Sequence, residues 1–171
     1  MTAGAVDPPI VFRAPRPQDL ATVVAIYNEG VLDRNATADL EPVTVEQRRA
    51  WFAEHLEGRF PLIIAEAGGA VLGWASVSPY HTRCAYSSTV EVSVYVRRHV
   101  RGAGIGRALL AEIAARAREA GFRRLIAHVF SHNAASNRLC SGGGFDRWGS
   151  LKGVTVIDGV ERDVEIWGLA L

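Results

Sequence analysis

The sequence predicts a single α+β domain built around a mixed sheet. Apolar residues alternate along residues 90–96 and 163–169, which is typical of strands, and they recur at helical spacing in 20–31 and 105–117. No repeat, low-complexity tract or linker interrupts the chain. A length of 171 residues with 49% hydrophobic content suits one domain with a proper core, so strands and helices are expected to share it.

The chain is expected to open with a strand, a helix and a loop. Residues Ile10–Arg13 favour a short strand. The prolines and the acid of Pro15–Asp19 then suit the start of a helix that runs to about Val31. Its apolar side chains fall on one stripe, so this helix should cover a core, and residues 33–42 should follow it as a loop.

A second helix and a hairpin are expected next. Thr44 and Gln47 have the spacing of a capping box, in which each side chain satisfies a backbone donor of the other residue, so a helix should run from here to about Leu56 and end at Gly58. The glycines at 68 and 69 then separate two apolar runs, which predicts an antiparallel hairpin with strands at Leu62–Glu66 and Val71–Val77.

The second half should alternate between strands and helices. After a loop over residues 79–88, the sequence predicts in turn a strand at 90–96, a helix ending at Ala120-Gly121, a strand at 125–130, a short helix from Asn133 to the glycines 142–144, and a last hairpin that begins at Phe145. The hairpin turn is expected at Asp158-Gly159, before a half-buried final strand over residues 163–169.

Composition excludes several classes of function. The formal net charge is +1, which offers no electrostatic case for nucleic acid or for an anionic membrane. Residues 1–9 lack the features of a secretion signal and are expected to be a flexible segment. Cys84 and Cys140 form neither a metal-ligand spacing nor a disulfide framework, so we expect a reduced, cytoplasmic protein without a metal.

The most informative segment is a β-branched strand followed by a glycine-rich turn at the start of a helix. Glycines lack a Cβ, so backbone N–H groups can point into one concavity, where the positive end of the helix dipole favours an anion. A pyrophosphate is therefore expected on the run that consists of Arg101, Gly102, Ala103, Gly104, Ile105, Gly106 and Arg107. An ordinary tight turn between a strand and a helix is the simpler alternative for this loop taken alone.

Two other phosphate-binding loops do not match this spacing. The chain has no Gly-x-x-x-x-Gly-Lys string, which a phosphate-cradling NTPase loop requires. A dinucleotide fingerprint requires its third glycine one position later than Gly106, and an acidic residue at the end of the next strand. That strand, residues 125–130, carries no acid.

The pattern Arg-Gly-x-Gly-x-Gly after Val-x-Val resembles the coenzyme A loop of the GNAT superfamily of N-acetyltransferases. Further blocks, in the same order, resemble the phosphinothricin and methionine sulfoximine branch of that superfamily, and they lie at residues 25–28, 41–44, 48–52, 89–96 and 133–136. The resemblance extends from Val11 to Leu169. It implies a GNAT-type sheet that is mixed, mostly antiparallel and twisted, with helices on both faces.

The resemblance also implies a site. Glu91 matches the general base of the family, and the cofactor acetyl-CoA is expected on Val94, Tyr95 and Val96, on the glycine turn, on Asn133 and on Ser136. Without the resemblance, Glu91 is equally a solvent-facing strand residue, and Asn133 is a plain N-cap. On the acceptor side Tyr80, Arg83 and Tyr86 match, and Arg83 could pair with a carboxylate through its planar fork or could be a solvated loop residue. His128 and His132 match no family role.

Three departures from the branch limit what the resemblance implies. Cys140 stands where the family usually has a tyrosine or histidine that protonates the departing coenzyme A, so the general acid is left open. Ala38 stands where the branch has an aromatic pocket residue, which predicts a larger acceptor pocket. Residues 154–159 differ from the branch pattern, and Val92 replaces a usual polar residue. These changes are expected around the acceptor.

The expected function is acetyl-CoA-dependent N-acetylation of a small amino-acid-like amine, by direct attack in a ternary complex. The alternatives are a polyamine or a protein N-terminus as the acceptor, although the loop 79–88 is not acidic as a polyamine would favour. A non-catalytic acyl-CoA sensor is a further alternative, supported by Cys140 and opposed by Glu91. A homodimer is expected from the family alone.

Overall fold

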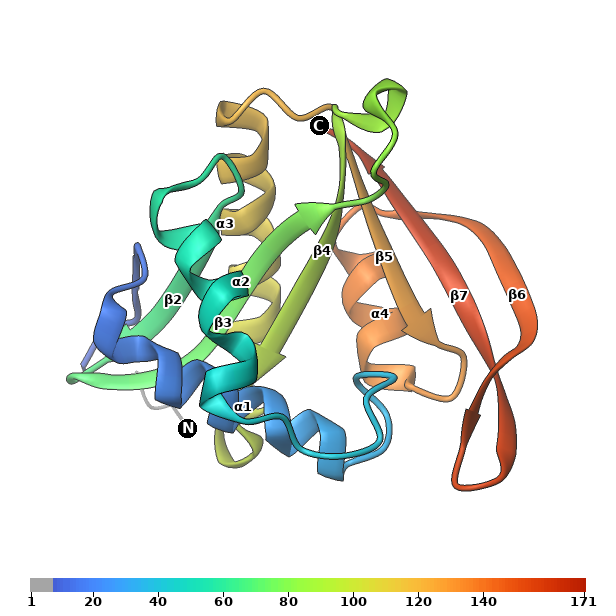
Figure 1. Cartoon of the computed structure of the whole chain (residues 1–171), viewed down its shortest axis with the longest axis horizontal. Helices are drawn as coiled ribbons and strands as arrows, with labels where there is room; N and C mark the ends of the chain where they lie inside the picture. Colours follow the sequence, from blue (N-terminus) through green and yellow to red (C-terminus); the bar gives the residue numbers. More distant parts are fainter. Residues whose placement is uncertain (1–7) are drawn as a thin grey trace, which may run out of the picture.

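One seven-stranded sheet forms the centre of the computed structural model, which describes residues 8–171 (Figure 1). The strand order is β1-β2-β3-β4-β5-β7-β6. The strands are β1 (Val11–Arg13), β2 (Leu62–Ala67), β3 (Ala70–Pro79), β4 (Thr89–Val96), β5 (Arg124–Phe130), β6 (Asp146–Ile157) and β7 (Val160–Ala170). The helices are α1 (Leu20–Leu32), α2 (Val45–Glu57), α3 (Ile105–Glu119) and α4 (Ala134–Gly142), with short 3-10 turns at Pro17–Asp19, Cys84–Tyr86 and Arg98–Val100. The expected flexible segment, residues 1–9, lies outside the described residues apart from Pro8 and Pro9.

Local signals place the element boundaries close to where the sequence predicts them. The Thr44 hydroxyl accepts a hydrogen bond from the Gln47 N–H, and the Gln47 side chain accepts one from the Thr44 N–H at 2.7 Å, which confirms the capping box before α2. Gly58 follows the last residue of α2. The hairpin turns at 68–69 and 158–159 also lie where they are expected.

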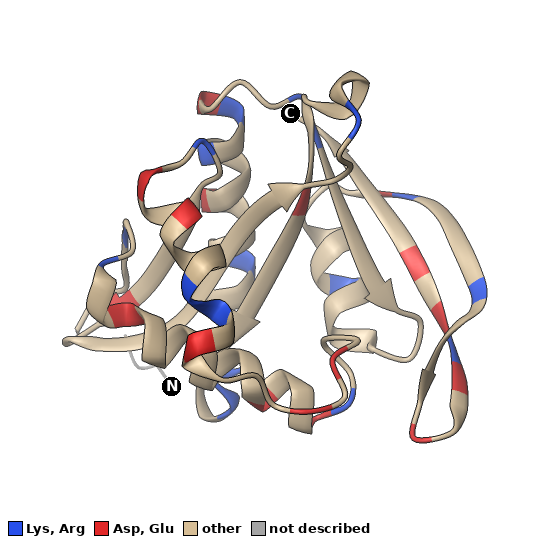
Figure 2. Cartoon of the chain, viewed as in Figure 1, with Lys and Arg blue, Asp and Glu red and all other residues tan. Residues whose placement is uncertain are grey.

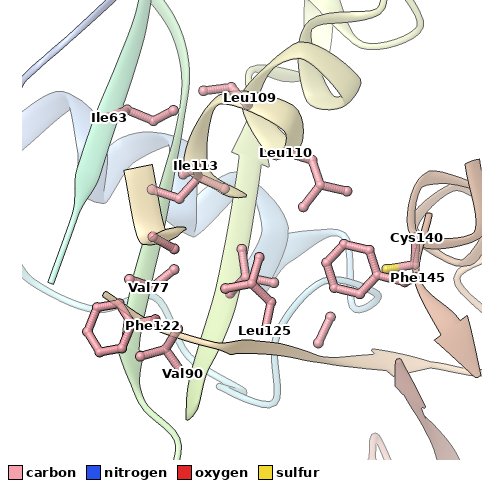
Figure 3. Close-up of a cluster of buried hydrophobic side chains, with 14 of the residues drawn as sticks. Ile63, Val77, Val90, Leu109, Leu110, Ile113, Phe122, Leu125, Cys140 and Phe145 are labelled. Carbon is pink, nitrogen blue, oxygen red and sulfur yellow. The ribbon is translucent and has the colours of Figure 1, made fainter. Parts of the chain in front are cut away.

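Helices cover both faces of the sheet, each over its own apolar cluster. On one face α1 and α2 pack with Trp74 of β3 into a cluster that includes Ile26, Phe52 and Ile64. On the other face α3 packs against the central strands, and Figure 3 shows Leu109, Leu110 and Ile113 of this helix above Val90 and Leu125. Successive side chains of a strand point to opposite faces of the sheet. Only residues of β4 and β5 that point to the same face can therefore share a site.

The parallel pair β4 and β5 interrupts an otherwise antiparallel sheet among the pairings of residues 8–171. Their pairing covers three positions, from Thr89 with Arg124 to Glu91 with Ile126, and stops there. Beyond this point the strands diverge, as Figure 1 shows. The edge of β4 that faces β5 is therefore without a strand partner from Val92 to Val96. This opening is where the fold can admit an extended ligand into the centre of the sheet.

The expected α+β architecture with a mixed, mostly antiparallel sheet and helices on both faces is confirmed. Charged residues of both signs are distributed over the ribbon rather than gathered by sign (Figure 2). Basic residues of the loop after β4 pair with the end of α1, where Arg98 and Arg101 each contact Asp33. These ion pairs attach the start of the glycine turn to the opposite helical layer. Among residues 8–171, no helix is long and apolar enough to cross a membrane.

Candidate active site

A cavity of about 540 Å³ runs through the opening between β4 and β5. Its lining comes from both helical layers, with Tyr27, Arg48 and Trp51 on the side of α1 and α2, and Leu110, Leu139 and Cys140 on the side of α3 and α4. This volume is in the range of small-molecule sites. Two ligands that enter from opposite faces of the sheet can therefore meet at the diverging strands.

Glu91 lies on the wall of this cavity at the last paired position of β4. Its side chain is 41% exposed, whereas its neighbours Val90 and Val92 point into the core on the other face. One carboxylate oxygen, Oε1, bonds to the ring of His128 at 2.9 Å. The other oxygen has no hydrogen-bond partner within residues 8–171, so it is available to a ligand in the cavity.

His128 is the partner of Glu91 that sequence reasoning discounted. The two residues are 37 positions apart and come together because Glu91 pairs with Ile126 across the parallel strands, which places residue 128 on the same face. The hydrogen bond to Glu91 raises the pKa of the His128 imidazole, an effect that partial burial of the ring opposes. The Tyr80 ring stacks on the imidazole, with ring centroids 6.2 Å apart.

The glycine turn presents unpaired backbone donors next to α3. Gly102 and Gly104 have φ values of 84° and 83°, in the left-handed region that favours glycine. Within residues 8–171, the N–H groups of residues 102–104 donate to no protein acceptor, and the first turn of α3 adds further free N–H groups. Arg107 is exposed and takes part in no ion pair of the described chain. The arrangement can hold an anion such as a pyrophosphate.

Arg101 is held by protein groups rather than left free. Its guanidinium contacts Asp33 at 2.5 Å and the Val96 carbonyl at 2.9 Å. Val96 itself does not line the cavity, whereas Val94 and Tyr95 do. The Tyr95 ring packs between Tyr27 and Trp74, and burial raises the pKa of its hydroxyl far above the ordinary value. The Tyr95 side chain is therefore structural, and any contact of this stretch of β4 with a cofactor falls to its backbone and to Val94.

Asn133 and Ser136 line the cavity at the N-terminus of α4. The Asn133 side chain accepts a hydrogen bond from the Ser136 N–H at 3.0 Å, so it caps the helix, and it donates to the Asn35 carbonyl at 2.8 Å. Asn133 thus connects α4 to the loop after α1. Each end of its amide retains capacity for one more hydrogen bond.

None of the three expected acceptor residues lines the cavity. Tyr80 is half-buried beside His128, but Arg83 and Tyr86 are exposed on the loop before β4. A polar cluster that sequence reasoning missed does line the cavity, from the side of α1 and α2. The Tyr27 hydroxyl bonds to Thr37 and donates to Asp39, while the Arg48 guanidinium lies 4.4 Å from the centre of the Tyr27 ring.

The departures from the family pattern fall in different places. Ala38 lines the cavity, and Thr155 of β6 reaches it as well, so both are placed to affect an acceptor. Val92 also borders the cavity, but its side chain packs in the cluster under α3 rather than on the Glu91 face. Cys140 is 4% exposed and packs beside Phe145 (Figure 3). Burial raises the pKa of its thiol to about 11.

Among residues 8–171, no three histidine, cysteine, aspartate or glutamate side chains gather in a way that could hold a metal ion. No hydrogen bond joins either cysteine thiol to a histidine in this part of the chain. The polar groups that line the cavity are a carboxylate, an imidazole, an arginine, hydroxyls and amides. Such a set suits proton transfer and the binding of a polar organic ligand.

A matching family model and two similar proteins are described as acetyltransferases. The family model described as "Acetyltransferase (GNAT) family" matches residues 24–145. The Bacillus subtilis protein YwnH is 42% identical over 163 residues, which cover 95% of this chain and 99% of YwnH. An L-methionine sulfoximine/L-methionine sulfone acetyltransferase of Pseudomonas aeruginosa is 38% identical over 134 residues, which cover 78% of each chain.

Solved structures agree with the sequence comparisons. The phosphinothricin acetyltransferase Pat from Sinorhizobium meliloti, solved in complex with acetyl-CoA, has a TM-score of 0.90 at 31% identity, over 95% of this chain and 88% of that one. YncA from Salmonella typhimurium, solved with its cofactor acetyl-CoA, also has a TM-score of 0.90, at 34% identity, over 95% and 94%. The resemblance seen in the sequence is confirmed, and the chain belongs to the GNAT family of acetyltransferases.

Proposed function

We propose that this chain transfers the acetyl group of acetyl-CoA to the α-amino group of a small amino-acid-like acceptor. The observation that carries the proposal is the cavity between β4 and β5, which joins the two faces of the sheet and has Glu91 on its wall. Acetyl-CoA is the proposed acyl donor, which is supported by two structural relatives that were solved with it. Relatives named for phosphinothricin, methionine sulfoximine and methionine sulfone support an amino-acid-like acceptor.

The donor half of the site lies on the side of α3 and α4. The unpaired N–H groups of the glycine turn and the charge of Arg107 hold the pyrophosphate. The pantetheine arm lies along the free edge of β4, whose backbone groups lack a strand partner beyond Glu91. Asn133 and Ser136 contact the coenzyme from the N-terminus of α4 with the hydrogen-bonding capacity that they retain.

The reaction is a direct displacement at the thioester carbonyl. The free oxygen of Glu91 removes one proton from the acceptor ammonium, and the amine nitrogen then bonds to the carbonyl carbon. As the bond from carbon to sulfur breaks, the nitrogen releases its second proton to solvent and becomes the amide. Cys84 and Cys140 have no histidine partner in the described chain, which supports transfer without an acetyl-cysteine. Cys140 is a weaker acid than an ordinary thiol, so solvent protonates the departing thiolate.

The acceptor enters from the side of α1 and α2. Arg83 is proposed to pair with its carboxylate, since the guanidinium has no ion-pair partner within residues 8–171 and its loop starts at Tyr80, beside His128. Arg48 lines the cavity but contacts Asp39 at 3.3 Å, so its charge is partly satisfied. Replacing Arg83 by Gln should therefore raise KM for the acceptor more than the same change at Arg48.

The test is coenzyme A release from acetyl-CoA with a panel of acceptors. The panel contains phosphinothricin, methionine sulfoximine, methionine sulfone, ordinary amino acids, a polyamine and a peptide with a free N-terminus. We expect release that depends on an amino-acid-like acceptor and that falls on the order of a hundredfold or more in Glu91→Gln. Preference for the polyamine or the peptide would contradict the proposed acceptor, and equal turnover of Glu91→Gln would remove Glu91 from the mechanism.

Thermal unfolding with and without acetyl-CoA separates an enzyme from a sensor. A ligand that binds the folded state raises the unfolding midpoint whether or not it reacts. Wild type and Glu91→Gln are expected to be stabilised equally. Stabilisation without release for every acceptor of the panel would favour a non-catalytic acyl-CoA sensor.

We also propose a homodimer. The β6 and β7 hairpin carries large apolar side chains that are exposed in the single chain, namely Trp148, Leu151, Val154, Val156 and Val160. Such a surface is typical of an interface between protein chains. Sedimentation equilibrium of the wild type should give twice the mass of the chain, and Val156→Asp should reduce it; a wild-type monomer at micromolar concentration would contradict the dimer.

A further inference from the structure

Glu91 does not stand alone in the cavity, because its carboxylate is bonded to a histidine that has no role in the mechanism given so far. The Nδ1 atom of His128 lies 2.9 Å from Glu91 Oε1, and both side chains line the cavity. This contact spans the point where the two parallel strands separate, two residues beyond the last paired position of β5. It therefore occupies the place where the acceptor amine must lose its proton.

The geometry limits how His128 can move. Its strand pairs with β7 on the other side, where Ile166 lies opposite, and the Tyr80 ring stacks against the imidazole at an interplanar angle of 13°. The backbone and one ring face are thus fixed by neighbours, while the side chain remains 30% exposed. An imidazole held in this way can hold a carboxylate in one orientation and still exchange a proton with solvent.

Few titratable groups face this imidazole. Glu91 of β4 is the charged side chain in contact with it, and Tyr80, directly after β3, is the stacked neighbour. On the other side, β7 contributes the apolar Ile166. No arginine or lysine of residues 8–171 forms an ion pair with Glu91. Whether a positive charge lies beside the Glu91 carboxylate therefore depends on the protonation state of His128.

We propose that His128 is a positioning residue for Glu91, and that its protonation switches the carboxylate from a base to the partner of an ion pair. This proposal rests on the proposed function, with Glu91 as the base. Neutral His128 donates its Nδ1–H to Glu91 Oε1 and leaves the second oxygen to take the amine proton. When the imidazole gains a proton at Nε2, the imidazolium stabilises the carboxylate charge, which makes Glu91 a weaker base.

The sign of the pH dependence follows from the contact. Because the hydrogen bond to Glu91 raises the pKa of His128 above its ordinary value of 6.5, the imidazolium persists to higher pH than for a free histidine. Turnover should fall as the pH decreases through the pKa of His128. A carboxyl group alone ordinarily titrates at a lower pH than an imidazole, so an enzyme without His128 should keep its turnover further into acid.

The test is the pH profile of kcat at saturating acceptor and acetyl-CoA, measured for the wild type, His128→Gln and His128→Ala. Gln at position 128 can donate an N–H to Glu91 but does not titrate, whereas Ala removes both properties. We expect His128→Gln to keep the plateau of kcat within about threefold and to move the acidic limb lower by about one pH unit or more. His128→Ala should move the limb likewise and lower the plateau on the order of ten- to a hundredfold, since the carboxylate loses its orientation.

A matched control uses another histidine close in the sequence. His132 lies beyond the end of β5 and stacks on Phe130, and His132→Gln is expected to leave the pH profile unchanged. Melting curves with and without acetyl-CoA establish that each variant is folded and binds the donor. Acidic limbs that coincide in wild type and His128→Gln would overturn the switch, and an undiminished plateau in His128→Ala would overturn the positioning role.

Titration of His128 by NMR keeps this inference separate from the proposed function. In Glu91→Gln the neutral amide replaces the carboxylate that raises the pKa of His128, so this pKa should fall, whether or not any acceptor is turned over. An unchanged His128 pKa in Glu91→Gln would overturn the coupling even if the acetyltransferase assay succeeds. A lowered pKa together with full activity of Glu91→Gln would instead refute Glu91 as the base.

Discussion

Two carboxylates of this chain, Asp19 and Glu91, each lie within 3 Å of a basic side chain, yet their surroundings differ. Arg13 bonds to both oxygens of Asp19 at 2.7 and 2.9 Å, the Arg16 N–H donates to one of them, and the carboxylate is 6% exposed. Glu91 is 41% exposed, offers one oxygen to a histidine that can lose its charge, and leaves the other free. A carboxylate with every oxygen occupied by a permanent cation supports the fold, whereas one with a free oxygen can do chemistry.

Other evidence agrees that the oxygens of Asp19 are occupied, and a further acid of the sheet resembles Asp19 rather than Glu91. The hydrogen bonds from Arg13 hold the pKa of Asp19 below its ordinary range. Glu165, on β7, is likewise occupied by Ser131, Arg147 and Ser150. Among these acids only Glu91 lines the cavity. Its position at the diverging strands and its free oxygen therefore distinguish Glu91, the proposed catalytic carboxylate, from the other two acids, whereas the presence of a basic partner does not.

The largest expected effect is on the free energy of unfolding, through the buried carboxylate of Asp19. Asp19→Asn removes the buried carboxylate that is the main counter-ion of the partly buried Arg13, so the free energy of unfolding should fall by about 3 kcal/mol. Urea unfolding followed by circular dichroism measures it. Glu66→Gln removes the outer, 25% exposed partner of Arg13 and should cost about 1 kcal/mol or less. Equal losses in the two variants would show that burial does not distinguish these partners.

The second prediction concerns free hydrogen-bond donors, the backbone N–H groups of the glycine turn, in place of a free carboxylate oxygen. Gly104→Ala forces a non-glycine residue to φ 83°, which should cost about 1–2 kcal/mol, although no atom crowds the new methyl group. Gly106→Ala is the matched control because it lies inside α3 with only ordinary contacts at 3.7 Å, and it should cost no stability. If the free N–H groups bind the pyrophosphate, KM for acetyl-CoA should rise in both variants. An unchanged KM in both would exclude the turn from the coenzyme site.

A smaller effect is expected at the thiol on the cavity wall. Cys140→Ala removes one buried sulfur atom from the cluster under α3, which should lower the free energy of unfolding by about 1 kcal/mol. Because the thiol is a weak acid with a pKa of about 11, kcat should stay within about threefold of wild type. Steady-state kinetics of coenzyme A release gives the answer, and a loss of a hundredfold would restore Cys140 as the general acid.

The smallest expected effect is the contribution of Asp19 to the pH dependence of the unfolding free energy. Because the pKa of Asp19 is lowered by folding, its contribution to stability is complete above the ordinary pKa of about 3.9 and is lost as the pH falls through the value in the folded state. Wild type should therefore lose more unfolding free energy between pH 5 and pH 3 than Asp19→Asn does. Parallel losses in the two chains would mean that other acids control the acid stability.

Features encoded within a few residues could be predicted from the sequence. The capping box of Thr44 and Gln47 and the glycine-rich turn at the start of a helix depend on local backbone chemistry, and the structure confirms both elements. The free oxygen of Glu91 and the role of His128 could not be predicted in the same way. They depend on where the parallel pairing of β4 and β5 begins and stops, and the periodicity of a single strand does not contain that information.

The acceptor side shows the same limit. Arg83, the proposed partner of the acceptor carboxylate, is exposed on its loop and lies outside the cavity lining, so its role stays a prediction. Arg48 and Tyr27 reach the cavity because α1 and α2 pack across the sheet over Trp74, which is a tertiary contact. A single histidine in a strand carries no local signal, so His128 could be found only after the register of β4 and β5 was known.

The most direct test of the distinction between the two carboxylates is to measure turnover and unfolding free energy together in Glu91→Gln and Asp19→Asn. Glu91→Gln should lose on the order of a hundredfold or more in kcat and stay within about 0.5 kcal/mol of wild-type stability. Asp19→Asn should show the opposite pattern, with wild-type kcat per folded molecule and a large loss of stability. Wild-type turnover in Glu91→Gln, or a loss of stability that matches that of Asp19→Asn, would contradict the assignment of Glu91 as the catalytic carboxylate.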